Sequence, residues 1–105
     1  MIDISPAQLV EVRQILNRHV PGSEVRAFGS RVTGRTKPWS DLDLAVVGPE
    51  PIGWQNVEIL KEAFQESTLP FRVDVLDWHE TSPSFQAIIA QQYAVIQASE
   101  HIGAV

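Results

Sequence analysis

The sequence predicts an α/β (α+β) fold, in which a small mixed β-sheet has helices mainly on one face. Two observations favour this class. Strand-like segments alternate with helix-like ones, and the first two strand-like segments follow each other without a helical connection between them. The chain has 105 residues, 44% of them apolar, which is enough to bury one core. We therefore expect residues 1–105 to form a single domain.

Three segments have the spacing of amphipathic helices: residues 5–19, 54–66 and 83–92. Ser5-Pro6 and Ser82-Pro83 each suit a helix cap followed by the first helical turn. The side chains that we expect on the buried faces are Leu9, Val12, Leu16 and Val20 in the first helix, Trp54, Val57, Leu60 and Phe64 in the second, and Phe85, Ile88 and Ile89 in the third.

The strand-like segments are residues 24–28, 41–47 and 71–76, and we expect a short closing strand at residues 93–97. The connection between the first two is too short for a helical crossover, so this pair is expected to be antiparallel. A strand–helix–strand unit follows. Residues 98–105 have no regular pattern and are expected to fray.

Composition limits the classes of function. The chain has no cysteine, which excludes disulfides and thiolate chemistry and is compatible with the cytoplasmic location that we expect. The formal net charge is −5, whereas a protein that grips long nucleic acid usually has a basic surface. The N-terminus lacks the features of a signal peptide, and no apolar run approaches the length of a membrane span. We expect no direct binding of long nucleic acid or of a membrane.

Two carboxylates stand two residues apart on the second predicted strand. Asp41 and Asp43 therefore share a face, where their charges repel unless a cation lies between them. Asp74 is on the next predicted strand with apolar neighbours, and it reaches the same face if the two strands are adjacent. Mg²⁺ prefers such oxygen ligands together with phosphate and water. Three carboxylates can hold two Mg²⁺ ions about 4 Å apart for phosphoryl or nucleotidyl transfer.

Gly29-Ser30 precedes this pair and follows the first predicted strand. Gly29 allows close approach of a ligand, and Ser30 offers a hydroxyl and an N–H to phosphate oxygens. No Gly-Lys-Ser/Thr follows, so this is not a P-loop. Of the basic loop residues Arg31, Arg35 and Lys37, we expect Arg31 to contact nucleotide phosphates.

Each of these features also has a purely structural interpretation. An isolated Asp-x-Asp occurs by chance in many acidic chains, and Gly29-Ser30 could be only a tight turn; the combination with Asp74 favours a site. Trp39 could stack on a base or a partner, but packing beneath the loop is preferred. Asp77 would face away from Asp74 and is not counted as a ligand. Glu58 and Lys61 are expected on a solvated helix surface.

At residues 28–47 the sequence resembles the polymerase-β-like nucleotidyltransferases, whose signature is Gly-Ser, ten residues, then Asp-x-Asp. The Gly-Ser-Arg form and the Ser-Asp-Leu-Asp-Leu run at residues 40–44 resemble the minimal nucleotidyltransferases, or MNT domains. The resemblance covers about residues 5–97. It implies a polymerase-β-like core, ATP phosphates on Gly29-Ser30, and Mg²⁺ on Asp41 and Asp43, with Asp74 completing the metal site or acting as base.

The resemblance also implies a function. Small family members are similar to antitoxins whose partner is a helical HEPN-domain toxin, and we expect no counterpart here of the extra domain by which larger relatives bind an acceptor. The expected reaction is transfer of AMP from ATP to a tyrosine of that toxin. Two alternatives stay open: transfer to a small molecule such as an aminoglycoside, and a non-catalytic antitoxin that blocks its partner by binding alone.

Overall fold

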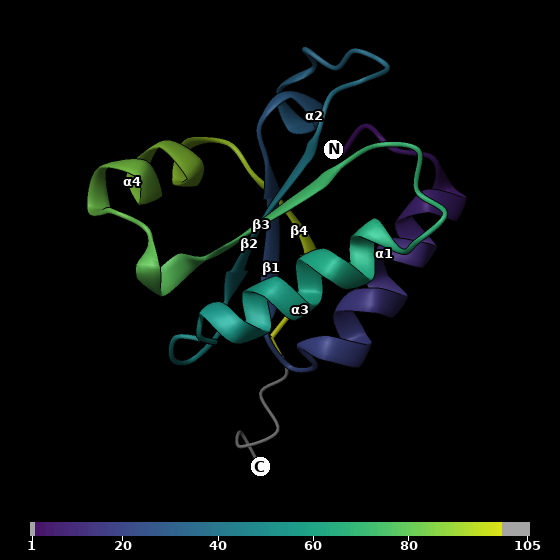
Figure 1. Cartoon of the computed structure of the whole chain (residues 1–105). Helices are drawn as coiled ribbons and strands as arrows, with labels where there is room; N and C mark the ends of the chain where they lie inside the picture. Colours follow the sequence, from purple (N-terminus) through teal and green to yellow (C-terminus); the bar gives the residue numbers. More distant parts are fainter. Residues whose placement is uncertain (1, 100–105) are drawn as a thin grey trace.

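Four strands form one mixed sheet in the computed structural model, which describes residues 2–99 (Figure 1). The strands lie in the order β3-β2-β1-β4, and their bounds are Glu24–Phe28 (β1), Leu42–Val47 (β2), Val73–Asp77 (β3) and Ala94–Gln97 (β4). The helices are Pro6–His19 (α1), Ser30–Thr33 (α2), Trp54–Gln65 (α3) and Pro83–Gln91 (α4), with a 3-10 turn at Trp78–Glu80 (η1). The expected order of elements is confirmed. The expectation for residues 98–105 falls almost entirely outside the described residues.

The strand pairing gives the sheet its mixed character. β1 is antiparallel to both β2 and β4, as the short connection between β1 and β2 predicted. β2 and β3 are parallel, because the chain crosses over between them through α3. The central position of β1 and β2 explains the apolar character of Leu42–Val47.

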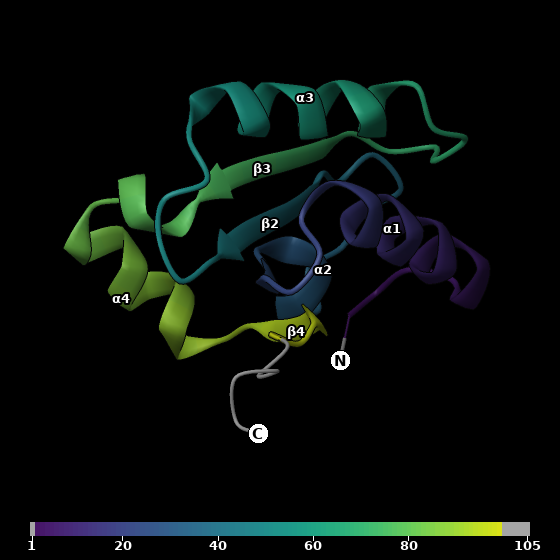
Figure 2. The same cartoon turned by 90° about the horizontal axis from the view of Figure 1, so that it is seen from below.

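The core lies between one face of the sheet and the pair α1 and α3, while α4 lies apart from these two helices (Figure 2). The helices contribute Val12, Leu16, Leu60 and Phe64 to it, and the strands contribute Val25, Ala27, Leu42, Leu44, Val46, Val73 and Val75. Helix α1 starts as expected, since the Ser5 hydroxyl accepts a hydrogen bond from the Gln8 N–H at 3.1 Å and the Ser5 N–H donates to Gln8 Oε1 at 2.9 Å. Because α1 and α3 cover one face, the opposite face of β2 and β3 is left open for polar side chains.

Asp77 lies on the covered face at the end of β3, as expected from its spacing to Asp74. Its buried carboxylate accepts hydrogen bonds from the N–H groups of Ile52 at 2.9 Å, Gly53 at 3.2 Å and His79 at 3.2 Å. These bonds satisfy backbone donors at the start of α3 and at the turn after β3. Asp77 is therefore a structural residue that fixes where α3 begins.

Two expectations about buried side chains were wrong. In α4 only Ile89 is buried, whereas Ile88 is 60% exposed and Phe85 is 37% exposed, because α4 does not lie over the core. Phe85 instead meets Phe28 edge to face, at 5.8 Å between ring centroids, on the open side of the sheet. Trp54 is 74% exposed; at about 100° per residue it lies about 120° around the helix from Leu60.

Within residues 2–99, no helix combines the length and the apolar character that crossing a membrane requires.

Candidate active site

The register of the sheet brings Asp43 and Asp74 together. They are paired residues of the parallel strands β2 and β3, so their side chains leave the sheet on the same face. Their neighbours Leu42, Leu44, Val73 and Val75 are buried on the other face, which fixes this orientation. Asp41 is exposed and immediately precedes β2. The structure thus places the three expected carboxylates at the beginning of two adjacent strands.

Gly29 lies directly against this carboxylate group. Its φ is +83°, a conformation that L-residues with a side chain rarely adopt, and a Cβ at this position would fall well inside contact distance of Asp43 Oδ2. Asp43 is paired across the sheet with Phe28, the last residue of β1. The turn at Gly29 and the Asp43 carboxylate are therefore one packed unit, and glycine is required because the two approach so closely.

Ser30 begins the four-residue helix α2 that follows the turn. The Gly29 carbonyl accepts hydrogen bonds from the N–H groups of Val32 and Thr33, both at 3.0 Å, which curls the chain around Ser30. The Ser30 carbonyl is held by the Arg35 N–H at 3.2 Å and the Thr36 hydroxyl at 3.1 Å. Among residues 2–99 the Ser30 hydroxyl has no hydrogen-bond partner, so it can accept or donate to a ligand.

Arg31 supports the loop from beneath. Its side chain is buried, and its guanidinium donates to the Ser40 carbonyl and to the Asp3 carbonyl, both at 3.0 Å, while lying 4.2 Å from the centre of the Phe71 ring. This placement argues against the expected contact between the guanidinium and phosphates. The sequence offered no signal for it, because the three partners are distant along the chain.

Trp39 is 74% exposed, so the expectation that it packs beneath the loop was wrong. The position under the loop is taken by Arg31, which ties residue 40 to the N-terminal segment. Lys37 lies 5.7 Å from the centre of the Trp39 ring. An exposed indole two residues before Asp41 is therefore available to a ligand or a partner.

The carboxylates act on one another electrostatically. Burial, together with the negative charges of Asp74 and Asp41, raises the pKa of Asp43 to about 6, and the Arg72 guanidinium opposes this rise. Near neutral pH the site consequently holds closely spaced negative charge that a cation would stabilise.

We expect ionisation of Asp43 to lower the stability of the folded protein. Its pKa in the folded protein, about 6, exceeds its ordinary value of 3.8, so its contribution to stability is complete below pH ~4 and is lost as the pH rises through ~6. Asp43→Asn cannot ionise and should avoid this loss. Its free energy of unfolding relative to wild type should rise by about 1–2 kcal/mol between pH ~4 and ~7, less than the full shift implies because solvent screens a half-buried group. Urea unfolding without divalent metal measures this difference, and a constant difference across that range would contradict it.

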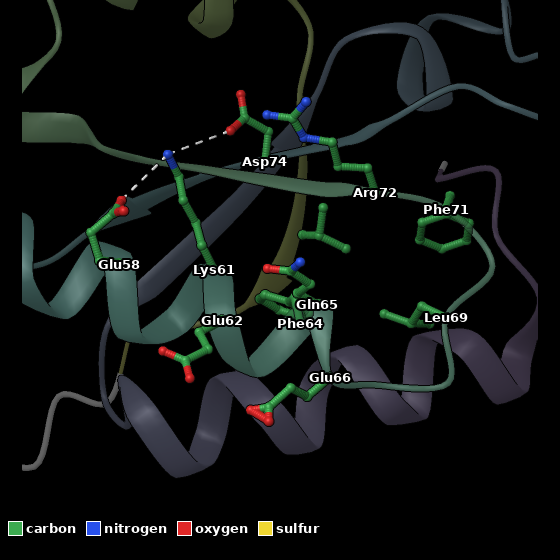
Figure 3. A pocket seen from close by; sticks show the side chains of 11 residues that line it. Glu58, Lys61, Glu62, Phe64, Gln65, Glu66, Leu69, Phe71, Arg72 and Asp74 are labelled. Carbon is green, nitrogen blue, oxygen red and sulfur yellow. Dashed lines mark ion pairs between the residues drawn. The ribbon is translucent and has the colours of Figure 1, made fainter.

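A groove between α3 and β3 begins at Asp74 (Figure 3). Lys61 of α3 points across it, with Nζ 3.8 Å from Asp74 Oδ1 and 3.7 Å from Glu58 Oε2. Lys61 was expected on a solvated helix surface, and the sequence could not show that α3 packs on β3 in a way that brings this side chain to the third carboxylate. Lys61 is therefore a charged residue of the site that sequence reasoning missed, and so is Arg72, whose guanidinium acts on Asp43.

The carboxylates of the site fit a hard divalent cation that takes some of its ligands from the protein and the others from a bound nucleotide. Within residues 2–99 no three acidic or histidine side chains lie close enough together to hold a metal ion by themselves. Asp43 and Asp74 nevertheless offer carboxylate oxygens on one face, and Asp41 is close enough to Asp43 to raise its pKa. Mg²⁺ is usually bound by one or two carboxylates plus substrate phosphates and water rather than by an all-protein cage. The arrangement is thus suited to metal that binds together with a triphosphate.

The fold and the site define a nucleotidyltransferase, and comparison with known proteins confirms this: residues 9–104 match the nucleotidyltransferase domain, and the chain belongs to that family. It is similar to the "Probable protein adenylyltransferase MntA" of Haemophilus influenzae. The two are 50% identical over 99 residues, which cover 94% of this chain and 87% of the relative. The expected resemblance to minimal nucleotidyltransferases is therefore confirmed.

Solved structures show the same fold. A crystal structure of a toxin–antitoxin with AMP-PNP matches with a TM-score of 0.75 and 20% identity, covering 88% of this chain and 74% of the other. A structure of a tri-AMPylated Shewanella oneidensis HEPN toxin in complex with an MNT antitoxin matches with a TM-score of 0.61 and 18% identity, covering 89% and 71%. At these identities the likeness concerns the fold, and it confirms the expected fold class.

Proposed function

We propose that this protein is the antitoxin of a toxin–antitoxin pair and acts as a protein adenylyltransferase, transferring AMP from ATP to a tyrosine of a HEPN-family toxin. The observation that carries the proposal is the pairing of Asp43 with Asp74 beside the Gly29 turn, in a chain that is 50% identical to an MntA adenylyltransferase over nearly its whole length. Of the two solved structures of related fold, one contains the ATP analogue AMP-PNP and the other contains a HEPN toxin that carries AMP groups.

Each residue has a task in this reaction. The Ser30 hydroxyl and the N–H groups at the start of α2 bind the phosphates of ATP, and the Gly29 turn lets them approach Asp43. Asp41 and Asp43, with Asp74, would hold Mg²⁺, which neutralises phosphate charge and orients the triphosphate. The acceptor hydroxyl oxygen forms a bond to the α-phosphorus while the bond to pyrophosphate breaks. Asp74 lies beside Asp43 on the edge strand β3, where it can take the hydroxyl proton.

The acceptor comes from another protein in this proposal. The formal charge of −5 suits a partner with a basic surface, because opposite charges steer association. Trp39 is exposed beside Asp41 and gives the partner an apolar contact close to the reacting groups. We place the reaction in the cytoplasm, where ATP is available.

The proposal is tested by following label from ATP to a purified HEPN-family partner in the presence of Mg²⁺. Label from the α-phosphate should appear on the partner, label from the γ-phosphate should not, and the intact mass of the partner should rise by whole AMP groups. Asp41→Asn should abolish the transfer. Absence of transfer by the wild-type protein, or full transfer by Asp41→Asn, would overturn the proposal.

The same experiment separates the alternatives. A labelled small molecule formed from an aminoglycoside without the partner would identify a different acceptor. A partner that is silenced equally well by wild type and by Asp41→Asn would identify an antitoxin that works by binding alone.

A further inference from the structure

Lys61 connects the catalytic edge of the sheet to α3. Its ammonium lies between Asp74 and Glu58, at 3.8 Å and 3.7 Å from their nearest carboxylate oxygens (Figure 3). Glu58 precedes it by three residues and lies one helical turn away on the same side of α3. Lys61 therefore has two carboxylates to pair with, one in the active site and one outside it.

This contact singles out Asp74 among the three carboxylates. In the part of the chain that the structure describes, Asp74 forms an ion pair, with Lys61, whereas Asp41 and Asp43 form none. Asp43 and Asp74 are paired residues of adjacent strands, so their negative charges repel. The ammonium partly offsets this repulsion and draws one oxygen of Asp74 toward α3 and away from Asp43.

A divalent metal at Asp74 would meet this ammonium as a competitor. The two cations repel each other, and Asp74 Oδ1 cannot be oriented fully toward both. Nothing locks Lys61 in place, because its side chain is 39% exposed and Glu58 offers it a second partner. Movement of the ammonium toward Glu58 would release Asp74 without unfolding any element.

We infer that Lys61 is a positioning residue that holds the Asp74 carboxylate before divalent metal binds and competes with the metal for it, with Glu58 as the partner that accepts Lys61 afterwards. This inference rests on the proposed function, because it assigns a metal to Asp74. It goes further by giving the apoenzyme a built-in counter-ion that sets how strongly metal binds before a nucleotide arrives.

The test is the affinity for Mn²⁺ alone, measured from the electron paramagnetic resonance signal of the free ion, with no nucleotide or partner present. Lys61→Met should bind Mn²⁺ about three- to tenfold more tightly than wild type, the effect expected when a unit charge about 6 Å from a divalent ion is removed from a largely solvated site. Glu58→Gln should bind it more weakly, because Lys61 then pairs with Asp74 alone.

Matched variants separate competition from general charge. Lys61→Arg keeps the positive charge and should restore affinity close to that of wild type. Glu62→Gln makes the same change as Glu58→Gln in the same groove, next to Lys61 in sequence but without an ion pair to it, and should have little effect. Thermal unfolding of each variant checks that it is folded.

Unchanged or weaker Mn²⁺ binding by Lys61→Met would overturn the role of Lys61, and so would equal effects of Glu58→Gln and Glu62→Gln. A different result would contradict the proposed function. If Asp43→Asn binds Mn²⁺ as tightly as wild type, the metal does not bind at the proposed site, and the role of Lys61 is then excluded as well.

Discussion

Replacing Asp43 by asparagine should lower the rate of AMP transfer to the partner by about 10²- to 10³-fold, the scale observed when one preorganised stabilising group is removed from an active site. Asp43 lies between Asp74 on β3 and the Gly29 turn, so in the proposed reaction it is the carboxylate that joins the metal-binding and phosphate-binding parts of the site. Asparagine keeps the size of the side chain but removes the negative charge that we propose for binding Mg²⁺. The measurement is the initial rate of label transfer from ATP at saturating Mg²⁺.

The control for this prediction is Asp3→Asn, which makes the same chemical change at an exposed position outside the site. Arg31 is bound by the Asp3 backbone carbonyl and not by its carboxylate, so the loop should be unaffected. Asp43→Asn should stay folded, since its ionisation costs stability near neutral pH. A variant that is folded, binds its partner and still transfers AMP within tenfold of the wild-type rate would contradict the assignment of Asp43.

The position of the candidate carboxylates could be predicted because it follows from local rules. Alternation along a strand puts Asp43 opposite Leu42 and Leu44 and puts Asp74 opposite Val73 and Val75, while Asp41 lies just before β2. The one non-local step was the assumption that the second and third strands are neighbours, and the parallel pairing of β2 and β3 confirms it.

What the sequence could not predict depends on how elements pack. Helical periodicity correctly predicted that Leu60 and Phe64 are buried, and it wrongly predicted the same for Ile88. The reason is that periodicity does not indicate whether a helix lies over the core. Helix α4 lies apart from α1 and α3, so its apolar side is left largely exposed. Arg31 and Lys61 show the same limit for charged residues. Their partners, the Asp3 carbonyl and the Asp74 carboxylate, are brought to them only by the tertiary structure.

The close packing of Gly29 against Asp43 leads to the second large effect, which is expected for Gly29→Ala. The new methyl group would collide with Asp43 Oδ2, and the backbone would have to keep a φ of +83° that alanine disfavours. The strain should cost about 1–3 kcal/mol of stability. Relief of the collision must move either the Asp43 carboxylate or the start of α2, so the groups that we propose for phosphate binding and metal binding lose their relative position. Misplacement of about 1 Å can cost about 10²-fold in rate, and we expect a loss of at least that size.

Gly22→Ala separates these two causes. Gly22 has a φ of +81°, almost the same as Gly29, but a Cβ there would meet nothing within 4 Å, and the residue lies between α1 and β1, away from the carboxylates. Both variants should therefore lose stability in urea unfolding, while Gly29→Ala alone should lose transfer activity and affinity for ATP in equilibrium binding. Equal activities for the two variants would show that the close approach of Gly29 to Asp43 is only a folding requirement. Loss of activity in Gly29→Ala alone would show that the contact itself sets the geometry in which the nucleotide meets the carboxylates.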